Sequence, residues 1–448
     1  MAAEIKTARE LAADIVHRLR EAGHEAYFVG GCVRDLVLGR NPGDYDIATS
    51  AHPDVVQQLF PVTIPVGVSF GVVLVVMGGK NHEVATYRTE DSYDDGRRPS
   101  HVSFSSLVED VRRRDFTING LALDPETGRI IDYVGGQADI RDRIIRTIGD
   151  PAQRFAEDHL RLLRAIRFSA NLGFDMDPDT FAAIVKNASL IRKISAERIR
   201  DELTKSLTRQ GARRAIELLH TSGLLREVLP EVEALRGVSQ PPEFHPEGDV
   251  WEHTLRMVDG LLGISEQDEA DHRLAWAVLL HDVGKAVTRS EDERGVHFYG
   301  HVEKGVKMAD TILRRLKFSG ADTETILALI ANHMRFMNVR QMKVSTLKRF
   351  LRLPDFDLHL ALHHLDCIGS HGMLDYEIFC RQALADLPVE TLHPPRLLTG
   401  HDLKAMGFTA GPMFKEILRS VEDAQLSGEI STAEDARRWV LERFSSFR

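Results

Sequence analysis

The sequence has very few cysteines, no long hydrophobic run and no excess of basic charge. Its 448 residues include three widely separated cysteines, Cys32, Cys367 and Cys380, and no CxxC pair. This argues against a disulfide framework or a thiolate zinc site and favours a reducing, cytoplasmic location. The most apolar stretch, residues 71–79 (GVVLVVMGG), is about half as long as a membrane-spanning helix, and it predicts a buried strand.

The charge limits the partners that the protein can bind. The chain has 57 Lys and Arg against 67 Asp and Glu, a net charge of −10, whereas a protein that coats nucleic acid nonspecifically is normally basic. Residues 151–220 differ from the rest, with 13 basic and 9 acidic residues. That segment is either a solvated helical face or a strip that binds phosphates. The first 19 residues are charged throughout, so we expect no signal peptide and no membrane association.

The hydrophobic pattern predicts an α+β protein with a mixed N-terminal part and a helical remainder. Residues 5–22 predict an amphipathic helix, and short strands are expected at 26–29, 44–48, 72–77 and 83–87. The polar stretch 88–101 has no periodicity and predicts a long mobile loop. After residue 150, apolar residues recur every three or four positions, which predicts helices.

The first candidate functional residues follow an early strand. Gly30 and Gly31 come between this strand and a predicted helix that carries Arg34, a pattern that suits either a tight turn or a backbone cradle for phosphates. Asp44 and Asp46 are two positions apart, so their carboxylates would share one face of a strand. Two such carboxylates repel each other unless a cation lies between them, and two Mg²⁺ ions would also support phosphoryl transfer. The alternative is a solvated turn.

Three further acids extend this set. Glu83, in the last predicted strand, is either a third metal-binding carboxylate or a surface residue. Asp158 and Arg161, preceded by Glu157, stand three apart in a predicted helix and are therefore neighbours. Such a pair could be a surface ion pair worth about 0–1 kcal/mol. It could also select C and A without a template, because both bases offer an amino donor beside a ring-nitrogen acceptor.

Five motifs occur in a characteristic order: GGCVRD, DYDIATSA, RRDFTIN, DYVGGQAD and EDHLRLLRAIRF. Together they resemble those of the class II tRNA nucleotidyltransferases, the CCA-adding enzymes, which are close relatives of bacterial poly(A) polymerases. The resemblance implies Mg²⁺ on Asp44 and Asp46, the incoming nucleotide on Gly31, Arg34 and Arg114, the base on Asp158 and Arg161, and the triphosphate near Arg164 and Arg167. It also implies CTP, ATP and tRNA as substrates. The expected parts are a nucleotidyltransferase head and a helical neck, body and tail, at residues 1–150, 151–220, 221–375 and 376–448.

Two stretches bear on which nucleotides are added. Residues 66–71 (VGVSFG) lack the basic block of poly(A) polymerases, and residues 88–101 keep a loop that enzymes adding only CC lack. The resemblance therefore favours an enzyme that adds both C and A. An enzyme that adds only A or makes poly(A) is the alternative within the superfamily.

A second constellation lies in the helical part. His281-Asp282 end an apolar run, and imidazoles and carboxylates from several helices can converge on a divalent metal. The pattern resembles the HD-domain metal phosphohydrolases, which form the body of some tRNA nucleotidyltransferases. It implies that the ligands of a transition metal, Ni²⁺, Co²⁺ or Mn²⁺, are His253, His281, Asp282 and Asp366, with His301 and His333 completing a two-metal version. The alternatives are histidines that are relics of the fold, or a phosphohydrolase whose head only binds nucleotides.

Overall fold

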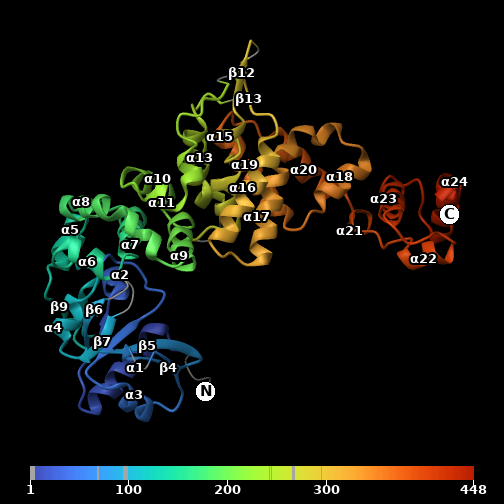
Figure 1. Ribbon diagram of the computed structural model, residues 1–448. Helices are drawn as coiled ribbons and strands as arrows, with labels where there is room; N and C mark the ends of the chain where they lie inside the picture. Colours follow the sequence, from blue (N-terminus) through green and yellow to red (C-terminus); the bar gives the residue numbers. More distant parts are fainter. Residues whose placement is uncertain are drawn as a thin grey trace. The chain divides into compact units, whose positions relative to one another are not determined.

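Figure 1 shows the computed structural model, which describes residues 6–67, 70–93, 99–241, 243, 245–264, 268–293 and 295–447. The chain divides into two compact units. The first comprises Met1–Glu233 and Arg315–Lys317, and the second comprises Ala234–Arg314 and Phe318–Arg448. The first unit combines a mixed sheet with helices, and the described part of the second is helical apart from one short hairpin. The predicted α+β class is confirmed.

The core of the first unit is a seven-stranded sheet in the order β3-β4-β5-β2-β1-β8-β9. Its strands are β1 (Ala26–Val29), β2 (Asp46–Thr49), β3 (Thr63–Gly67), β4 (Val72–Met77), β5 (Lys80–Thr86), β8 (Leu121–Leu123) and β9 (Ile130–Asp132). β2 and β5 run parallel, and the other neighbours are antiparallel. β1 and β4 lie where they are predicted, whereas β2 begins two residues later than expected and β5 three residues earlier.

The prediction of a long loop at residues 88–101 is wrong, because the structure has two strands in this stretch. β6 (Arg88–Tyr93) and β7 (Pro99–Phe104) form a separate two-stranded antiparallel sheet in which Arg88 faces Phe104. A two-stranded ribbon need not bury a continuous apolar face, so its polar sequence shows no alternation. Residues 68–69 and 94–98, which belong to the two stretches that bear on nucleotide choice, lie outside the described residues.

Helices surround the sheet and continue beyond it. In the first unit they are α1 (Ala8–Glu21), α2 (Gly31–Val37), α3 (Pro53–Leu59), α4 (Leu107–Arg112), α5 (Gly136–Asp142), α6 (Pro151–Glu157), α7 (Arg161–Leu172), α8 (Pro178–Asn187), α9 (Ala196–Leu207), α10 (Ala212–Thr221), α11 (Leu224–Val228) and α12 (Pro230–Glu233), with β10 (Ile144–Ile145) paired to β11 (Asp175–Met176). α1 begins with a capping box between Thr7 and Glu10. α7 is buried over most of its length, which places its arginines inside the unit.

The second unit is arranged around one buried helix. α14 (His272–Leu280) is buried from Leu274 to Leu280 and packs against α13 (Val250–Asp259), α17 (Gly320–Asn332) and α19 (Phe356–Gly369). The other elements are α15 (Lys285–Thr288), β12 (Ser290–Asp292), β13 (Gly295–His297), α16 (His301–Arg315), α18 (Val344–Leu351), α20 (Asp375–Asp386), α21 (Val389–Leu392), α22 (Gly400–Ala405), α23 (Met413–Leu426) and α24 (Ala433–Phe444). The last three helices enclose a small core of their own.

Candidate functional sites

The first site is built around the turn between β1 and α2. Gly30 has a φ of 75°, a left-handed conformation that favours glycine. A Cβ atom at this position would lie 3.1 Å from Nη1 of Arg114 and 4.0 Å from Oδ2 of Asp46. The turn therefore needs glycine both for its backbone and for the close approach of a guanidinium and a carboxylate.

Three carboxylates gather beside this turn. Asp46 begins β2, and the parallel register of β2 and β5 places Glu83 beside it. Asp44 precedes the strand, so the expectation that both aspartates lie on a strand is wrong for Asp44. Tyr45 is buried, with its ring 5.2 Å from that of Phe28, while both aspartates are exposed. The packing of the tyrosine, and not strand alternation, separates the two acids from the core.

The charges around Asp46 favour a bound cation. Asp46 keeps exposed surface, but the surrounding protein removes part of the water around its carboxylate. This loss of water raises the pKa of Asp46 to about 6, and the negative charges of Glu83 and Asp44 contribute to the rise. Arg114 acts in the opposite direction, but its Nη2 also pairs with Oδ2 of Asp110 at 3.1 Å. Carboxylates that repel one another are stabilised by a cation, and oxygen atoms are the ligands that Mg²⁺ prefers. The chemistry of these oxygens therefore fits Mg²⁺, although they are spread more widely than the groups of ligand atoms within 4.8 Å that occur in the second unit.

Arg34 and Arg164 are connected through buried polar side chains. Nη1 of Arg34 donates to Oδ1 of Asn119 at 2.9 Å, and Nδ2 of Asn119 donates to Oδ1 of Asp115 at 3.1 Å. Nη2 and Nε of Arg164 donate to Oδ2 of Asp115 at 2.6 and 2.8 Å. Although burial acts to raise the pKa of Asp115, its bonds to Arg164 and Asn119 lower it to about 2. The network thus joins two guanidinium groups to one carboxylate, that of Arg34 through the neutral amide of Asn119 and that of Arg164 directly.

Three guanidinium groups surround the ring of Phe168. Their carbon atoms lie 5.3, 5.2 and 4.2 Å from the ring centroid, for Arg34, Arg164 and Arg167 in turn. Nε of Arg167 also donates to Oε2 of Glu202 at 2.7 Å. The arginines expected beside the triphosphate are therefore clustered, and a bound triphosphate would share them with these protein partners.

The predicted pair of Asp158 and Arg161 does not form, and the helix expected over 157–168 is interrupted. Asp158 takes an extended conformation between α6 and α7, and its Oδ1 accepts from the backbone N of Leu160 at 3.0 Å. Nη1 of Arg161 pairs instead with Oε2 of Glu157 at 2.7 Å. Oδ2 of Asp158 pairs with Nη2 of Arg198 at 3.1 Å. Each group of the expected base-recognition pair is therefore held by a partner of its own.

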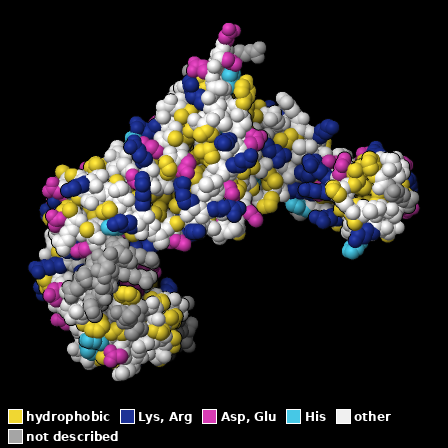
Figure 2. All heavy atoms as spheres, in the orientation of Figure 1, with side chains coloured by type: hydrophobic (Ala, Val, Ile, Leu, Met, Phe, Trp, Pro, Cys, Tyr) yellow, Lys and Arg dark blue, Asp and Glu magenta, His cyan; other side chains and the backbone are white. Residues whose placement is uncertain are grey.

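Most arginines of the basic segment 151–220 are paired with carboxylates of the same unit. Examples are the pairs of Arg213 with Glu217 at 3.0 Å and of Arg214 with Asp175 at 2.9 Å. Figure 2 shows basic and acidic side chains intermixed over α8 to α10. On the face in view, the segment therefore looks more like a solvated helical surface than a continuous strip for phosphates.

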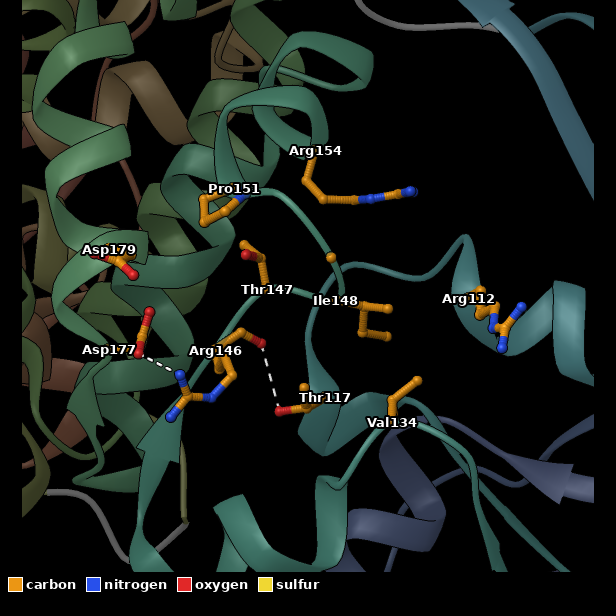
Figure 3. A pocket seen from close by; sticks show the side chains of 11 residues that line it. Arg112, Thr117, Val134, Arg146, Thr147, Ile148, Pro151, Arg154, Asp177 and Asp179 are labelled. Carbon is orange, nitrogen blue, oxygen red and sulfur yellow. Dashed lines mark hydrogen bonds and ion pairs between the residues drawn. The ribbon is translucent and has the colours of Figure 1, made fainter.

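The first unit also contains a cavity of about 470 Å³ (Figure 3). It is lined by Arg112, Thr117, Val134, Arg146, Thr147, Ile148, Gly149, Pro151, Arg154, Asp177 and Asp179. Arg146 forms an ion pair with Asp177 in its wall. Nη1 of Arg154 donates to Oε2 of Glu157 at 2.9 Å, and the same oxygen holds Arg161. The cavity wall is thus connected to the arginine expected to recognise the base.

The predicted histidines and aspartates of the second unit converge on one centre. They come from five helices or helix ends: His253 in α13, His281 and Asp282 directly after α14, His301 at the start of α16, His333 directly after α17, and Asp366 in α19. Their ligand atoms form two groups, each within 4.8 Å, namely His253 with His281 and Asp366, and Asp282 with His301 and His333. Within the described ranges, groups this compact occur only in this unit.

Backbone carbonyls orient three of these four histidines. Nδ1 of His281, His301 and His333 lies 2.9, 2.9 and 2.7 Å from the carbonyl oxygen three residues earlier. Nδ1 then carries the proton, and Nε2 keeps the lone pair that binds a metal. Nε2 of His281 and Nε2 of His301 are buried without a hydrogen-bond partner. Buried, unpartnered ligand atoms that converge in this way fit a metal centre.

Asp282 and His333 are held in the charge states that suit a metal. Nζ of Lys285 lies 2.7 Å from Oδ2 of Asp282, whose Oδ1 is buried and unpartnered. Although burial acts to raise the pKa of Asp282, the neighbouring His281 and Lys285 keep it well below its usual value. Burial and the neighbouring His281 lower the pKa of His333 to about 4. Ionised carboxylates and neutral imidazoles are the forms that bind metals, and a mixed nitrogen and oxygen set suits a transition metal.

Two residues of this centre are missing from the sequence prediction. His245 and Glu247 form a third compact group with His253. They lie in the segment HPEGD just before α13, where a loop gives no hydrophobic periodicity. The only sequence signal is a histidine and a glutamate two positions apart, which is too common to indicate a site by itself.

Comparison with known proteins agrees with this architecture. The family described as poly A polymerase head domain matches residues 26–146, the probable RNA and SrmB-binding site of polymerase A matches residues 173–235, and the HD domain matches residues 250–356. The fold, the carboxylates at the glycine turn and these matches define a nucleotidyltransferase with an HD-type helical body. Among the described residues, no helix combines the length and apolar character needed to cross a bilayer.

The relatives define the family. A CCA-adding enzyme of Geobacillus stearothermophilus is 53% identical over 436 residues, 96% of each chain. One from Geobacillus sp. (strain WCH70) is 54% identical over 211 residues, which cover 47% of this chain and about half, 52%, of the relative. A solved CCA-adding enzyme of Bacillus stearothermophilus, in complex with CTP, superposes with a TM-score of 0.74 at 32% identity, covering 98% of both chains. The chain belongs to the family of CCA-adding enzymes, which confirms the resemblance seen in its motifs.

Proposed function

We propose that this protein adds C and A to the 3′ end of tRNA from CTP and ATP, with release of pyrophosphate. The observation that carries the proposal is the cluster of Asp44, Asp46 and Glu83 beside the glycine turn, in a chain of the CCA-adding family. The similar structure of the Bacillus stearothermophilus enzyme in complex with CTP supports the choice of CTP. A head that only bound nucleotides would not need both aspartates, which argues against the phosphohydrolase-only alternative.

In the proposed reaction, the 3′-hydroxyl of the RNA attacks the α-phosphate of the nucleotide, and pyrophosphate leaves. Asp44 and Asp46 would hold Mg²⁺, and Glu83 adds negative charge beside them. When bound, Mg²⁺ neutralises the phosphates and makes the hydroxyl easier to ionise. Gly30 leaves room for the guanidinium of Arg114 next to Asp46, where it can bind a phosphate oxygen.

In this proposal the side chains of Asp158 and Arg161 select the base, and each is held in place by its own protein partner. Asp158, fixed by Arg198, accepts a hydrogen bond from the amino group of cytosine or adenine. Arg161, fixed by Glu157, donates to the ring nitrogen beside that amino group. UTP and GTP present an acceptor where cytosine and adenine present a donor, and a donor where they present an acceptor. Neither Asp158 nor Arg161 could then form its hydrogen bond to the base. Each hydrogen bond that the wrong base cannot form weakens its binding by about 1–3 kcal/mol.

The test uses the purified full chain with three tRNAs, one lacking CCA, one ending in C and one ending in CC. Each is incubated with CTP or ATP and Mg²⁺, and the products are separated on a sequencing gel. We expect two C to be added and then one A. Asp44→Ala should abolish both additions, whereas Asp142→Ala, which removes an exposed carboxylate that pairs with Arg141 at 3.1 Å, should change neither. Long A tails, or addition of A alone, would support one of the two narrower alternatives instead.

The second unit supports a second candidate function, hydrolysis of phosphate esters. The observation that favours it is the convergence of buried, unpartnered Nε2 atoms and the Oδ1 atom of Asp282. We propose Ni²⁺, Co²⁺ or Mn²⁺ at this centre, held by His253, His281, Asp282 and Asp366, with His301 and His333 completing a second position. The metal content of the purified chain and its hydrolysis of a 2′,3′-cyclic nucleotide test this. Absence of both metal and activity would show that the histidines are relics of the fold.

We also propose a cytoplasmic location and the division into head, neck, body and tail at residues 1–150, 151–220, 221–375 and 376–448. The three cysteines are free and buried, which supports a reducing compartment. The three family matches fall within or near the first three of these parts, which supports the division. Limited proteolysis, with the cleavage sites mapped by mass spectrometry, tests the boundaries.

A further inference from the structure

The segment just before α13 places a buried carboxylate against the metal centre of the second unit. The side chain of Glu247 has no exposed surface. Its Oε1 lies 2.8 Å from Nδ1 of His245 and 2.9 Å from Nδ1 of His253. Its Oε2 is buried without a hydrogen-bond partner. A buried carboxylate is costly unless it is paired, so this arrangement needs a reason.

The reason lies in the two nitrogen atoms of His253. Its Nε2 lies 3.2 Å from Oδ1 of Asp366, on the side of the metal centre. An imidazole can offer Nε2 to a metal only when the proton is on Nδ1, and the partner of Nδ1 decides this. His281, His301 and His333 each have a backbone carbonyl as that partner.

His253 differs because its ring has no such carbonyl among its described contacts. Its backbone N bonds to the carbonyl of Asp249 in the first turn of α13, and Nδ1 faces Oε1 of Glu247 instead. For His253, Oε1 of Glu247 thus lies at the distance where a carbonyl lies for the other three histidines, although both ring nitrogens of His253 are buried without a hydrogen-bond partner in this arrangement. His245 contacts the same oxygen and holds the carboxylate from the other side.

We infer that Glu247 is a positioning residue of the metal centre, which holds the proton on Nδ1 of His253 and directs Nε2 toward the metal. The inference rests on the proposed phosphohydrolase centre and adds to it a residue outside the predicted ligand set. Glu247 itself does not touch the metal. Groups that orient metal ligands in this way typically contribute about 10–100-fold to metal affinity.

The test measures binding of Co²⁺ and Mn²⁺ to the full chain, by competition with a chromophoric chelator and by the absorption spectrum of bound Co²⁺. Glu247→Ala should weaken binding about 10–100-fold. Glu247→Gln should weaken it less, because an amide oxygen at the same place can still face Nδ1 and accept its proton. Glu252→Gln is the matched control, since it changes a partly exposed carboxylate of α13 that pairs with Arg256, and it should leave binding unchanged. Addition of CCA, which uses the first unit, should be retained by all variants, and an unchanged thermal unfolding transition of the second unit shows that this unit is folded in each variant.

The outcomes separate the inference from the proposed function. Wild-type protein that binds no transition metal would overturn both. Wild-type binding with unchanged affinity in Glu247→Ala would overturn the positioning role alone. An altered Co²⁺ spectrum with equal losses in Glu247→Ala and Glu247→Gln would make Glu247 a ligand, and would likewise overturn the inference. Weaker binding with an unchanged spectrum, partly restored in Glu247→Gln, supports it.

Discussion

Replacing Asp46 by Asn should abolish nucleotide addition and, at neutral pH, stabilise the fold. Loss of water and the charges of Glu83 and Asp44 raise the pKa of Asp46 from 3.8 to about 6. The folded state therefore binds this proton more tightly than the unfolded state. The free energy of unfolding falls as the pH rises from about 4 to about 6, and the full penalty is present above that range.

The size of the effect follows from the shift. A rise from 3.8 to about 6 corresponds to about 3 kcal/mol at about 1.4 kcal/mol per unit. Asp46 is exposed, however, and solvent screens its repulsion, so we take about 1–1.5 kcal/mol. For a unit of this size, that corresponds to a rise of about 3–5 °C in the melting temperature of the first unit. Asn keeps the shape of the side chain and removes only the charge.

The assay is thermal unfolding of wild type, Asp46→Asn and the control Asp142→Asn, each with chelator and with Mg²⁺. In chelator at neutral pH, Asp46→Asn should melt above wild type, and the difference should vanish near pH 4 because Asp46 is then protonated. Mg²⁺ should stabilise the wild type more than Asp46→Asn, and Asp142→Asn should behave as wild type. Two results would refute the argument that Asp46 is held in a repulsive cluster. One is an Asp46→Asn variant that melts below wild type, and the other is a rise in melting temperature that is equal at neutral pH and near pH 4.

Three other changes test the remaining assignments. Asp158→Ala and Arg161→Ala should reduce discrimination against UTP and GTP by about ten- to a hundredfold, because each removes a charged hydrogen bond to the base. Single-nucleotide incorporation assays measure this, and unchanged selectivity in both variants would show that neither group contacts the base. Shortening the segment 88–101 should slow addition of A to tRNA ending in CC and spare addition of C. A shortened chain that completes CCA at the normal rate would exclude this role. The double change His281→Ala and Asp282→Ala should remove the transition metal and any ester hydrolysis, as measured by metal analysis and a hydrolysis assay. CCA addition, measured on a gel, should survive. Loss of CCA addition in a folded variant would show that the two sites are coupled.

Local sequence signals predicted the elements that local interactions stabilise. The apolar spacing of α1 and the apolar runs of β1 and β4 each act within a few residues, so they can be recognised without a structure. The same holds for the glycine turn, where φ at Gly30 requires glycine. Motif order then sufficed to identify the family, because five motifs together are specific although each one is not.

Only the tertiary structure decided how the functional side chains are paired. Arg161 bonds to Glu157, and Asp158 bonds to Arg198, because the chain leaves the helix at Asp158, and periodicity does not report an interruption of three residues. The contact of Arg34 with Asn119 joins residues 85 positions apart. No local signal encodes such a contact.

The metal centre of the second unit shows the same division. Its histidines and aspartates can be named from the sequence, since their chemistry is distinctive. Their orientation cannot, because it depends on which carbonyl or carboxylate faces each Nδ1 atom. No sequence pattern predicts a role for Glu247, since a glutamate in a loop is usually solvated. It becomes part of the centre only because the fold buries it against His253. The sequence thus determined which groups are available, and packing determined which of them face one another.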